Sequence, residues 1–244
     1  MKYAIVLLFV SFTVFSQKLE KMPTDLETDF ALSSLPPHLR EAATVYLLDP
    51  EKGYYVARKG TNGFTCMVVR TEWEWEEYID DTFSPLAYDV EGTNTIVQVY
   101  LDVAAMRASG RYTPSQLKQE IVKRVKNGTY KAPARPGISY MLAPMMRSHP
   151  GNSEIVSMIM PHYMFYAPNL TNEDIGGKYM NTPQPFILDS EPSLGKDHQI
   201  FNYIIVQAGE TEKAQILKEN TELLRRLAAF RLNLKVEVQA TDHH

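Results

Sequence analysis

The sequence predicts a single α+β domain with a mixed, largely antiparallel sheet and about three to four packed helices. Strand-like runs and amphipathic helical segments both occur, but they do not follow a regular β-α-β alternation. The best candidate for a domain boundary, residues 131–137, is too short to be more than a loop. The chain has 244 residues, of which 44% are hydrophobic, and can therefore bury a core without disulfides or structural metal.

The first element is an apolar N-terminal segment. Lys2 precedes an almost wholly apolar stretch over residues 3–10. Val14 and the small residue Ser16 then stand three residues and one residue before the expected cleavage site. This pattern is typical of a secretory signal peptide over residues 1–16, with cleavage between Ser16 and Gln17. The stretch is shorter than the about 18–20 residues that span a bilayer, and no later segment is long enough. We therefore expect an exported mature chain, periplasmic or extracellular, without an integral membrane segment.

The mature chain begins with residues 17–43, which we expect to form a lead-in segment that packs on the edge of a domain at 44–244. Any helix in this segment should end at Pro36-Pro37, because the residue before a proline avoids the helical region. Three strand-like runs follow, at 44–48, 54–58 and 64–70. A Pro- and Gly-containing turn joins the first two, and Asn62-Gly63, a strong hairpin signal, precedes the third. These runs predict a three-stranded antiparallel meander.

Apolar spacing and capping residues predict the helices, over residues 71–79, 93–109, 113–126 and 212–231. Thr71 and Glu74 have the spacing of a capping box, in which each side chain accepts a hydrogen bond from the other's backbone N–H. Thr113 and Gln116 repeat this spacing around Pro114, which suits a first helical position. The remaining strand-like segments are 138–142, 155–166, 185–188 and 203–207.

Composition excludes several classes of protein. The net charge of −4 gives no reason to expect nucleic acid or an anionic membrane as a partner. One cysteine excludes a disulfide framework and multi-cysteine zinc or iron–sulfur sites. Neither the Gly-x-Ser-x-Gly motif of serine hydrolases nor the His-Glu-x-x-His motif of zinc proteases occurs. The sequence identifies no activity, and the main prediction is that the chain binds a small ligand or a protein partner.

The enzyme alternative is a hydrolase or transferase that depends on a cysteine and a histidine. Cys66 would be the nucleophile, His162 the base, and Asp89 or Asn62 the group that orients the base. Each residue also has a structural interpretation. Asn62 belongs to a turn, and Cys66 shares a strand face with Val68, as a buried and unreactive thiol would. Asp89 precedes a predicted helix, where a negative charge is stabilising.

A copper site is the other alternative, against the main prediction of no cofactor. If residues 155–166 form one strand, Met158, Met160, His162 and Met164 share a face. Thioethers and imidazole are ligands that suit Cu(I). Methionine also fills irregular cores, and Pro161 should interrupt the strand.

An acidic run lies early in the predicted 71–79 helix and just beyond it. It lacks the loop spacing of a calcium site and predicts a solvated helix face. Its members are Glu72, Glu74, Glu76, Glu77, Asp80 and Asp81.

Three segments carry a resemblance: Gly60 to Cys66 (GTNGFTC), Gly137 to Leu142 (GISYML) and Pro161 to Met164 (PHYM). Together they resemble an uncharacterised family of exported bacterial proteins with Asn-Gly-aromatic-Thr-Cys, Gly-x-x-Tyr-Met-Leu and Pro-His-x-Met segments. The resemblance implies a bacterial exported origin and singles out Cys66, Tyr140 and His162, without giving them an activity. With Asn62, these residues are the predicted ligand-binding set, in a pocket near the Asn62 turn and His162.

Overall fold

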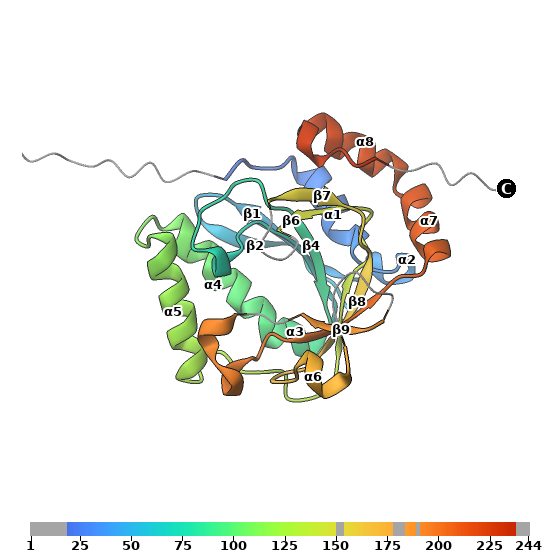
Figure 1. The fold of residues 1–244 in the computed structure, drawn as a ribbon. Helices are drawn as coiled ribbons and strands as arrows, with labels where there is room; N and C mark the ends of the chain where they lie inside the picture. The colour runs from blue at the N-terminus through green and yellow to red at the C-terminus, as the bar shows by residue number, and fades with distance from the viewer. Residues whose placement is uncertain (1–18, 150–153, 178–183, 189–190, 238–244) are drawn as a thin grey trace, which may run out of the picture.

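The structure is a computed structural model that describes residues 19–149, 154–177, 184–188 and 191–237. It confirms the α+β class, with a mixed sheet and helices on both of its faces (Figure 1). The predicted signal peptide lies outside the described residues. Within them, no helix is both long and apolar enough to cross a membrane.

In the part of the chain that the structure describes, eight strands form the main sheet, in the order β2-β1-β3-β4-β5-β8-β10-β9. Their bounds are β1 Thr44–Asp49, β2 Gly53–Arg58, β3 Thr65–Val69, β4 Ser84–Tyr88, β5 Ile138–Met141, β8 His162–Tyr166, β9 Phe186–Leu188 and β10 Tyr203–Gln207. A two-stranded sheet pairs β6 Met146–Ser148 with β7 Val156–Met158. The α-helices are α1 Thr24–Ser33, α2 Pro37–Arg40, α3 Val90–Asn94, α4 Ile96–Ala108, α5 Pro114–Lys126, α6 Asn172–Ile175, α7 Glu210–Glu219 and α8 Thr221–Phe230. Single 3₁₀ turns are η1 Trp73–Trp75, η2 Pro192–Leu194, η3 Lys196–His198 and η4 Leu232–Leu234.

The predicted meander is wrong in one pairing. β1 and β2 are antiparallel, but β3 pairs with the other side of β1 and runs parallel to it. The connection from β2 to β3 crosses the start of β1, where the backbone N–H groups of Thr61 and Asn62 donate to the Ala42 carbonyl. A Cβ on Gly60 would lie only 2.3 Å from this backbone, so the crossing requires glycine. Asn62-Gly63 is part of a crossover loop and not a hairpin turn.

Some of the predicted helices form as expected and others do not. α4 and α5 lie where expected, and α5 has the complete Thr113–Gln116 capping box. The predicted 212–231 helix divides at Asn220 into α7 and α8. The predicted 71–79 helix is wrong, because only η1 forms and Glu76 follows it in the left-handed conformation.

The 71–82 segment has another source of order. Arg70 donates to the carbonyls of Asp80 and Thr82, and Arg107 of α4 donates to the carbonyl of Ile79. These hydrogen bonds hold the backbone at the end of the predicted helix and just beyond it. The segment is therefore an irregular loop fixed by two buried guanidinium groups.

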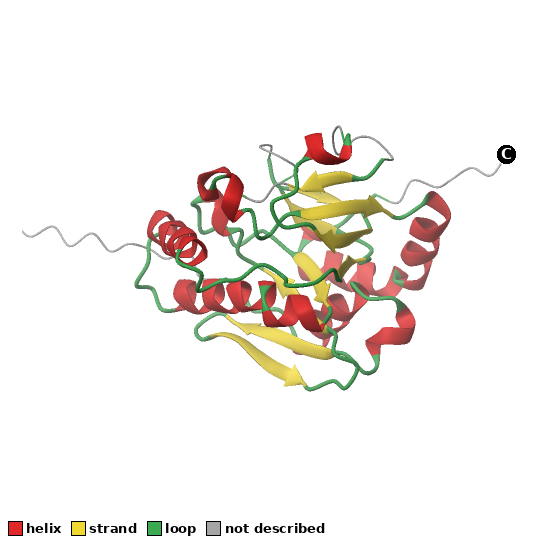
Figure 2. Ribbon diagram, turned by 90° about the horizontal axis from the view of Figure 1, so that it is seen from below, coloured by secondary structure: helices red, strands yellow, loops and turns green. Residues whose placement is uncertain are grey.

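The two larger hydrophobic cores of the described residues lie on opposite faces of the sheet, and helices cover both faces (Figure 2). We call them the α1 core, which α1 and α8 cover, and the α4 core, which α4 and α5 cover. Adjacent strand residues alternate between them: Cys66 and Val68 of β3 belong to the α1 core, and Met67 and Val69 to the α4 core. α1 packs on β1, β3 and β4 and buries Phe30 completely, so it covers the centre of a sheet face and not the edge we expected.

Candidate functional site

A cavity of about 840 Å³ lies within the α4 core. Strands β3, β4, β5, β8 and β10 form one wall, and α4, η1 and the β6–β7 sheet contribute others. Most lining side chains are apolar or aromatic. The volume is within the range of small-molecule sites, about 300–1,000 Å³, and such sites have this composition.

The cavity has an apolar rim. Val156 of β7 and Leu188 of β9 line it, although their side chains are 41% and 43% exposed. Val156 pairs with Ser148 and Leu188 pairs with Tyr203, and both partners also line the cavity. Directly paired residues point to the same side of a sheet. Val156 and Leu188 therefore mark where the cavity meets the surface.

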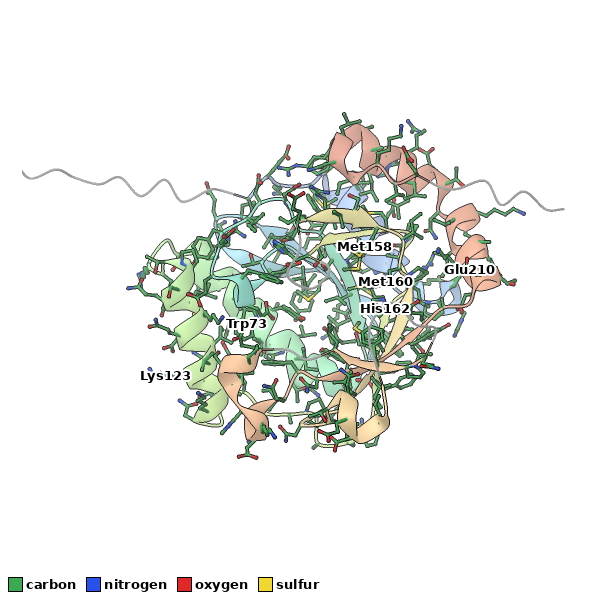
Figure 3. The ribbon with its side chains drawn as sticks, viewed as in Figure 1. Trp73, Lys123, Met158, Met160, His162 and Glu210 are labelled. Atoms are coloured by element: carbon green, nitrogen blue, oxygen red, sulfur yellow. The ribbon has the colours of Figure 1, made fainter. Side chains whose placement is uncertain are left out.

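The methionine row does not form one strand. Met158 ends β7 and His162 begins β8, and these strands belong to different sheets. Met158, Met160, His162 and Met164 nevertheless all line the cavity, together with Met141 and Met146. Figure 3 shows Met158, Met160 and His162 following one another along one side, with Trp73 across from them. The chain passes from the two-stranded sheet to the main sheet near Pro161, and the four predicted side chains nevertheless line the same cavity.

His162 presents a lone pair to this cavity. Its Nδ1 lies 2.7 Å from the carbonyl oxygen of Met160, which can only accept, so Nδ1 carries the proton. Burial lowers the pKa of the imidazole, which favours the neutral form. Its Nε2 is then unprotonated, and no hydrogen bond joins it to another described residue. His162 can therefore accept a hydrogen bond from a ligand or coordinate a metal.

Part of the acidic run faces the cavity, contrary to the prediction of a solvated helix face. Glu72 accepts a hydrogen bond from Ser148, and its Oε2 lies 2.8 Å from Nδ1 of His149. The His149 ring stacks on Trp75, with 4.5 Å between ring centroids. All of these residues line the cavity, so Glu72 is held in a polar and aromatic cluster on its wall.

Glu74 lies on the same wall between the two tryptophans of η1. Burial, opposed by a hydrogen bond from its own backbone N–H and assisted by the nearby carboxylates of Glu72 and Glu191, raises the pKa of its carboxyl to about 8. The nearby ammonium of Lys118 lowers this pKa, and its effect is the smallest of these. Glu74 is partly exposed and lines the cavity.

Three tyrosine hydroxyls form a cluster elsewhere on the cavity wall. The Tyr88 hydroxyl lies 3.5 Å from that of Tyr100 and 3.3 Å from that of Tyr203. All three residues line the cavity. They give an otherwise apolar space a second group of hydrogen-bonding atoms.

The structure does not bring Cys66 and His162 together, which corrects the enzyme alternative. Cys66 points into the α1 core, whereas His162 lines the cavity on the other face of the sheet. Burial raises the pKa of the Cys66 thiol to about 12, against a hydrogen bond with Ser34 that lowers it. A protonated thiol on the wrong face cannot be activated by His162.

The other predicted site residues have structural partners. The Asn62 side chain donates a hydrogen bond to the Leu39 carbonyl and accepts one from the Phe64 N–H. These two hydrogen bonds fix the crossover loop. Tyr140 packs beside Phe64 and Tyr163 on the α1 side of the sheet. The predicted binding set is therefore split, with His162 alone on the cavity.

Asp89 caps α3. Its carboxylate accepts hydrogen bonds from the backbone N–H groups of Gly92 and Ile138 and from the Tyr166 hydroxyl. This agrees with the structural interpretation of Asp89 as a negative charge at the start of a helix. The same carboxylate also connects α3 to β5 and β8 by hydrogen bonds.

Sequence reasoning missed the cavity residues Trp73, Trp75, Glu74 and Tyr100. The two tryptophans were placed in a predicted helix, where the capping-box spacing outweighed the concentration of aromatic and acidic residues. Among the described residues, no three His, Cys, Asp or Glu side chains form a group that could hold a metal ion. Comparison of the chain with protein-family models, curated proteins and solved structures finds no match.

Proposed function

We propose that this is an exported protein that binds a small, largely apolar molecule in the cavity of its α4 core. The cavity itself carries the proposal, because a space of about 840 Å³ lined mainly by methionines, aromatic and aliphatic side chains favours an apolar ligand. The few polar groups on its wall, Glu74, His162 and the tyrosine cluster, would orient the ligand. Export rests on the N-terminal sequence and is part of the proposal.

A neutral fluorescent probe, Nile red, tests binding. We expect a saturable rise in its emission, and Leu188→Asp should weaken binding at least about fivefold because a charge at the rim opposes entry of an apolar molecule. Leu232→Asp is the matched control, since Leu232 is 80% exposed and does not line the cavity. Absence of saturable binding, or equal affinity in both variants and the wild type, would contradict the proposal.

Cu(I) is a second candidate ligand, and a separate observation favours it. Met158, Met160 and Met164 line the cavity with His162, whose Nε2 is unprotonated. Soft thioether sulfur and neutral imidazole are both ligands for Cu(I).

Competition with a chromophoric Cu(I) chelator tests this candidate. We expect one Cu(I) per chain, lost in the double variant Met160→Leu and Met164→Leu. Met67→Leu is the control, because Met67 is fully buried in the same core away from the cavity. A stoichiometry near zero in the wild type rules copper out.

A further inference from the structure

The charges on the cavity wall do not balance. Lys118 has its ammonium within 3.3 Å of Glu76 and 3.2 Å of Glu191, and it donates a third hydrogen bond to the backbone carbonyl of Glu74. Three donors are all that an ammonium has. All three N–H donors of Lys118 are therefore used by other acceptors. The Glu74 carboxylate forms no ion pair with any other described residue.

Glu74 also lacks hydrogen-bond donors from other described residues. Its carboxylate receives a hydrogen bond only from its own backbone N–H, whereas the neighbouring Glu72 is bonded by Ser148 and His149. The ionised form of a carboxyl is costly in such surroundings without a cation, which is why the pKa of Glu74 is raised, and a ligand that supplied a positive charge would stabilise that form.

Aromatic side chains line the same cavity as Glu74. Trp73 and Trp75 flank Glu74 in η1, and Phe201 lies edge-on to Trp73 with 6.2 Å between centroids. Glu74 is close enough to the hydroxyls of Tyr100 and Tyr203 to raise the pKa of both. Aromatic faces attract cations, so these side chains and Glu74 favour the same ligand group.

We propose that the ligand is an amphiphilic amine, whose ammonium pairs with Glu74 among the aromatic side chains of η1 and whose alkyl or aryl body occupies the methionine-lined part of the cavity. This inference rests on the proposed function and specifies its ligand class. His162 fits it as well, because Nε2 is an acceptor and could receive an N–H or O–H from a ligand that carries a second polar group.

Binding of an ammonium would have a proton signature. The carboxyl of Glu74, with its pKa of about 8, is largely protonated at pH 6.5 and largely ionised at pH 9. At pH 6.5 the carboxyl must release its proton to the buffer before it can pair with the ammonium. The observed binding enthalpy should therefore vary with the ionisation enthalpy of the buffer at pH 6.5 and vary little at pH 9.

Octylamine and 1-octanol, which share one alkyl chain, provide the test by displacement of Nile red. At pH 9, we expect octylamine to displace the probe at about a tenfold lower concentration than octanol, as a charge-assisted hydrogen bond would give. Glu74→Gln should abolish this preference, so that within the variant octylamine and octanol displace the probe at about the same concentration. Glu77→Gln is the matched control, because Glu77 is exposed on the same loop and does not line the cavity.

The outcomes separate the two proposals. If Nile red binds but octylamine has no advantage over octanol, or if Glu74→Gln keeps the advantage, the amine inference is wrong and the apolar cavity remains. If Nile red shows no saturable binding, the proposed function fails and the amine inference fails with it.

Discussion

Single buried groups in this protein show how much the surroundings of a residue decide its chemistry. Cys66 and His162 were both candidates for catalysis, and both are fully enclosed. Cys66 lies in the α1 core, where burial raises its pKa despite a hydrogen bond with Ser34, whereas His162 has a lowered pKa and its Nε2 faces a cavity. The sequence predicted both as reactive groups, but their side chains lie on opposite faces of the sheet, and β4 and β5 separate β3 from β8. The residue left for chemistry is the one that faces empty space.

Glu27 of α1 gives a prediction at this scale. Its side chain is 2% exposed and accepts a hydrogen bond from the Leu48 N–H. Burial raises its pKa from 4.5 to about 7, so between these two values the folded protein keeps a proton that the unfolded chain releases. The free energy of unfolding should therefore fall as pH rises through this window.

Glu27→Gln removes this dependence and keeps an acceptor for Leu48. We expect the variant to be more stable than the wild type at pH 8 by up to about 3 kcal/mol, with little difference below pH 4.5. Urea unfolding at several pH values measures it. Glu41→Gln, at an exposed position, is the control and should leave the wild-type profile unchanged. A constant offset between Glu27→Gln and wild type at every pH would contradict the assignment.

At the scale of elements, local signals predicted the parts of the fold whose stability is local. The α5 helix was predicted with its cap, its Pro114 and its buried stripe, because a capping box and a 3.6-residue period lie within one segment. The 71–79 segment carries an equally good capping signal and does not form a helix. Its backbone is fixed by Arg70 and Arg107, and Arg107 lies on α4, far along the chain. A single-sequence pattern cannot contain that information.

Strand pairing shows the same limit. β4 escaped prediction because Pro85 interrupts a short run, although Pro85 lies within the strand opposite Val68. The parallel pairing of β3 with β1 depends on the close approach of Gly60 to the Ala42–Thr44 backbone, which the Asn62-Gly63 pattern does not indicate.

The α1 helix provides the prediction for elements. Because α1 covers the α1 core, Phe30→Ala should lower the free energy of unfolding by about 3–5 kcal/mol, as expected for a buried phenylalanine. Thr24→Ala, at an exposed position of the same helix, should change it by less than about 0.5 kcal/mol. Chemical denaturation measures both. A small effect of Phe30→Ala would show that α1 is the peripheral lead-in that its sequence suggested.

At the scale of the whole molecule, the sheet divides the protein into a filled half and a half that contains the cavity. Helix α1 packs directly against one face, and α8 packs against α1 in the same core. On the other face, α4 and the loop that carries η1 stand off enough to leave the cavity. The position of this loop therefore decides whether the binding space exists.

Arg107 links α4 to that loop. Its Nη1 lies within 3.2 Å of the Arg70 carbonyl, the Thr71 hydroxyl and the Ile79 carbonyl, and its guanidinium lies over the Tyr78 ring. Arg107→Lys keeps the charge but loses the planar group that reaches several acceptors at once. We expect a loss of about 2 kcal/mol in stability, from buried carbonyls left without donors, and a several-fold weaker binding of Nile red.

Arg111→Lys is the matched control, because Arg111 is exposed just beyond the end of α4. It should change neither unfolding in urea nor binding of the probe. The two measurements on Arg107→Lys distinguish a general loss of stability from a displaced cavity wall. If the variant binds Nile red with wild-type affinity at a temperature where it is fully folded, the 71–82 loop holds its position without α4. In that case the cavity is a property of the sheet and the β6–β7 hairpin alone. If affinity falls while the rest of the protein stays folded, α4 fixes the η1 tryptophans and Glu74 in place, and binding at the cavity is coupled to the packing of α4 against the sheet.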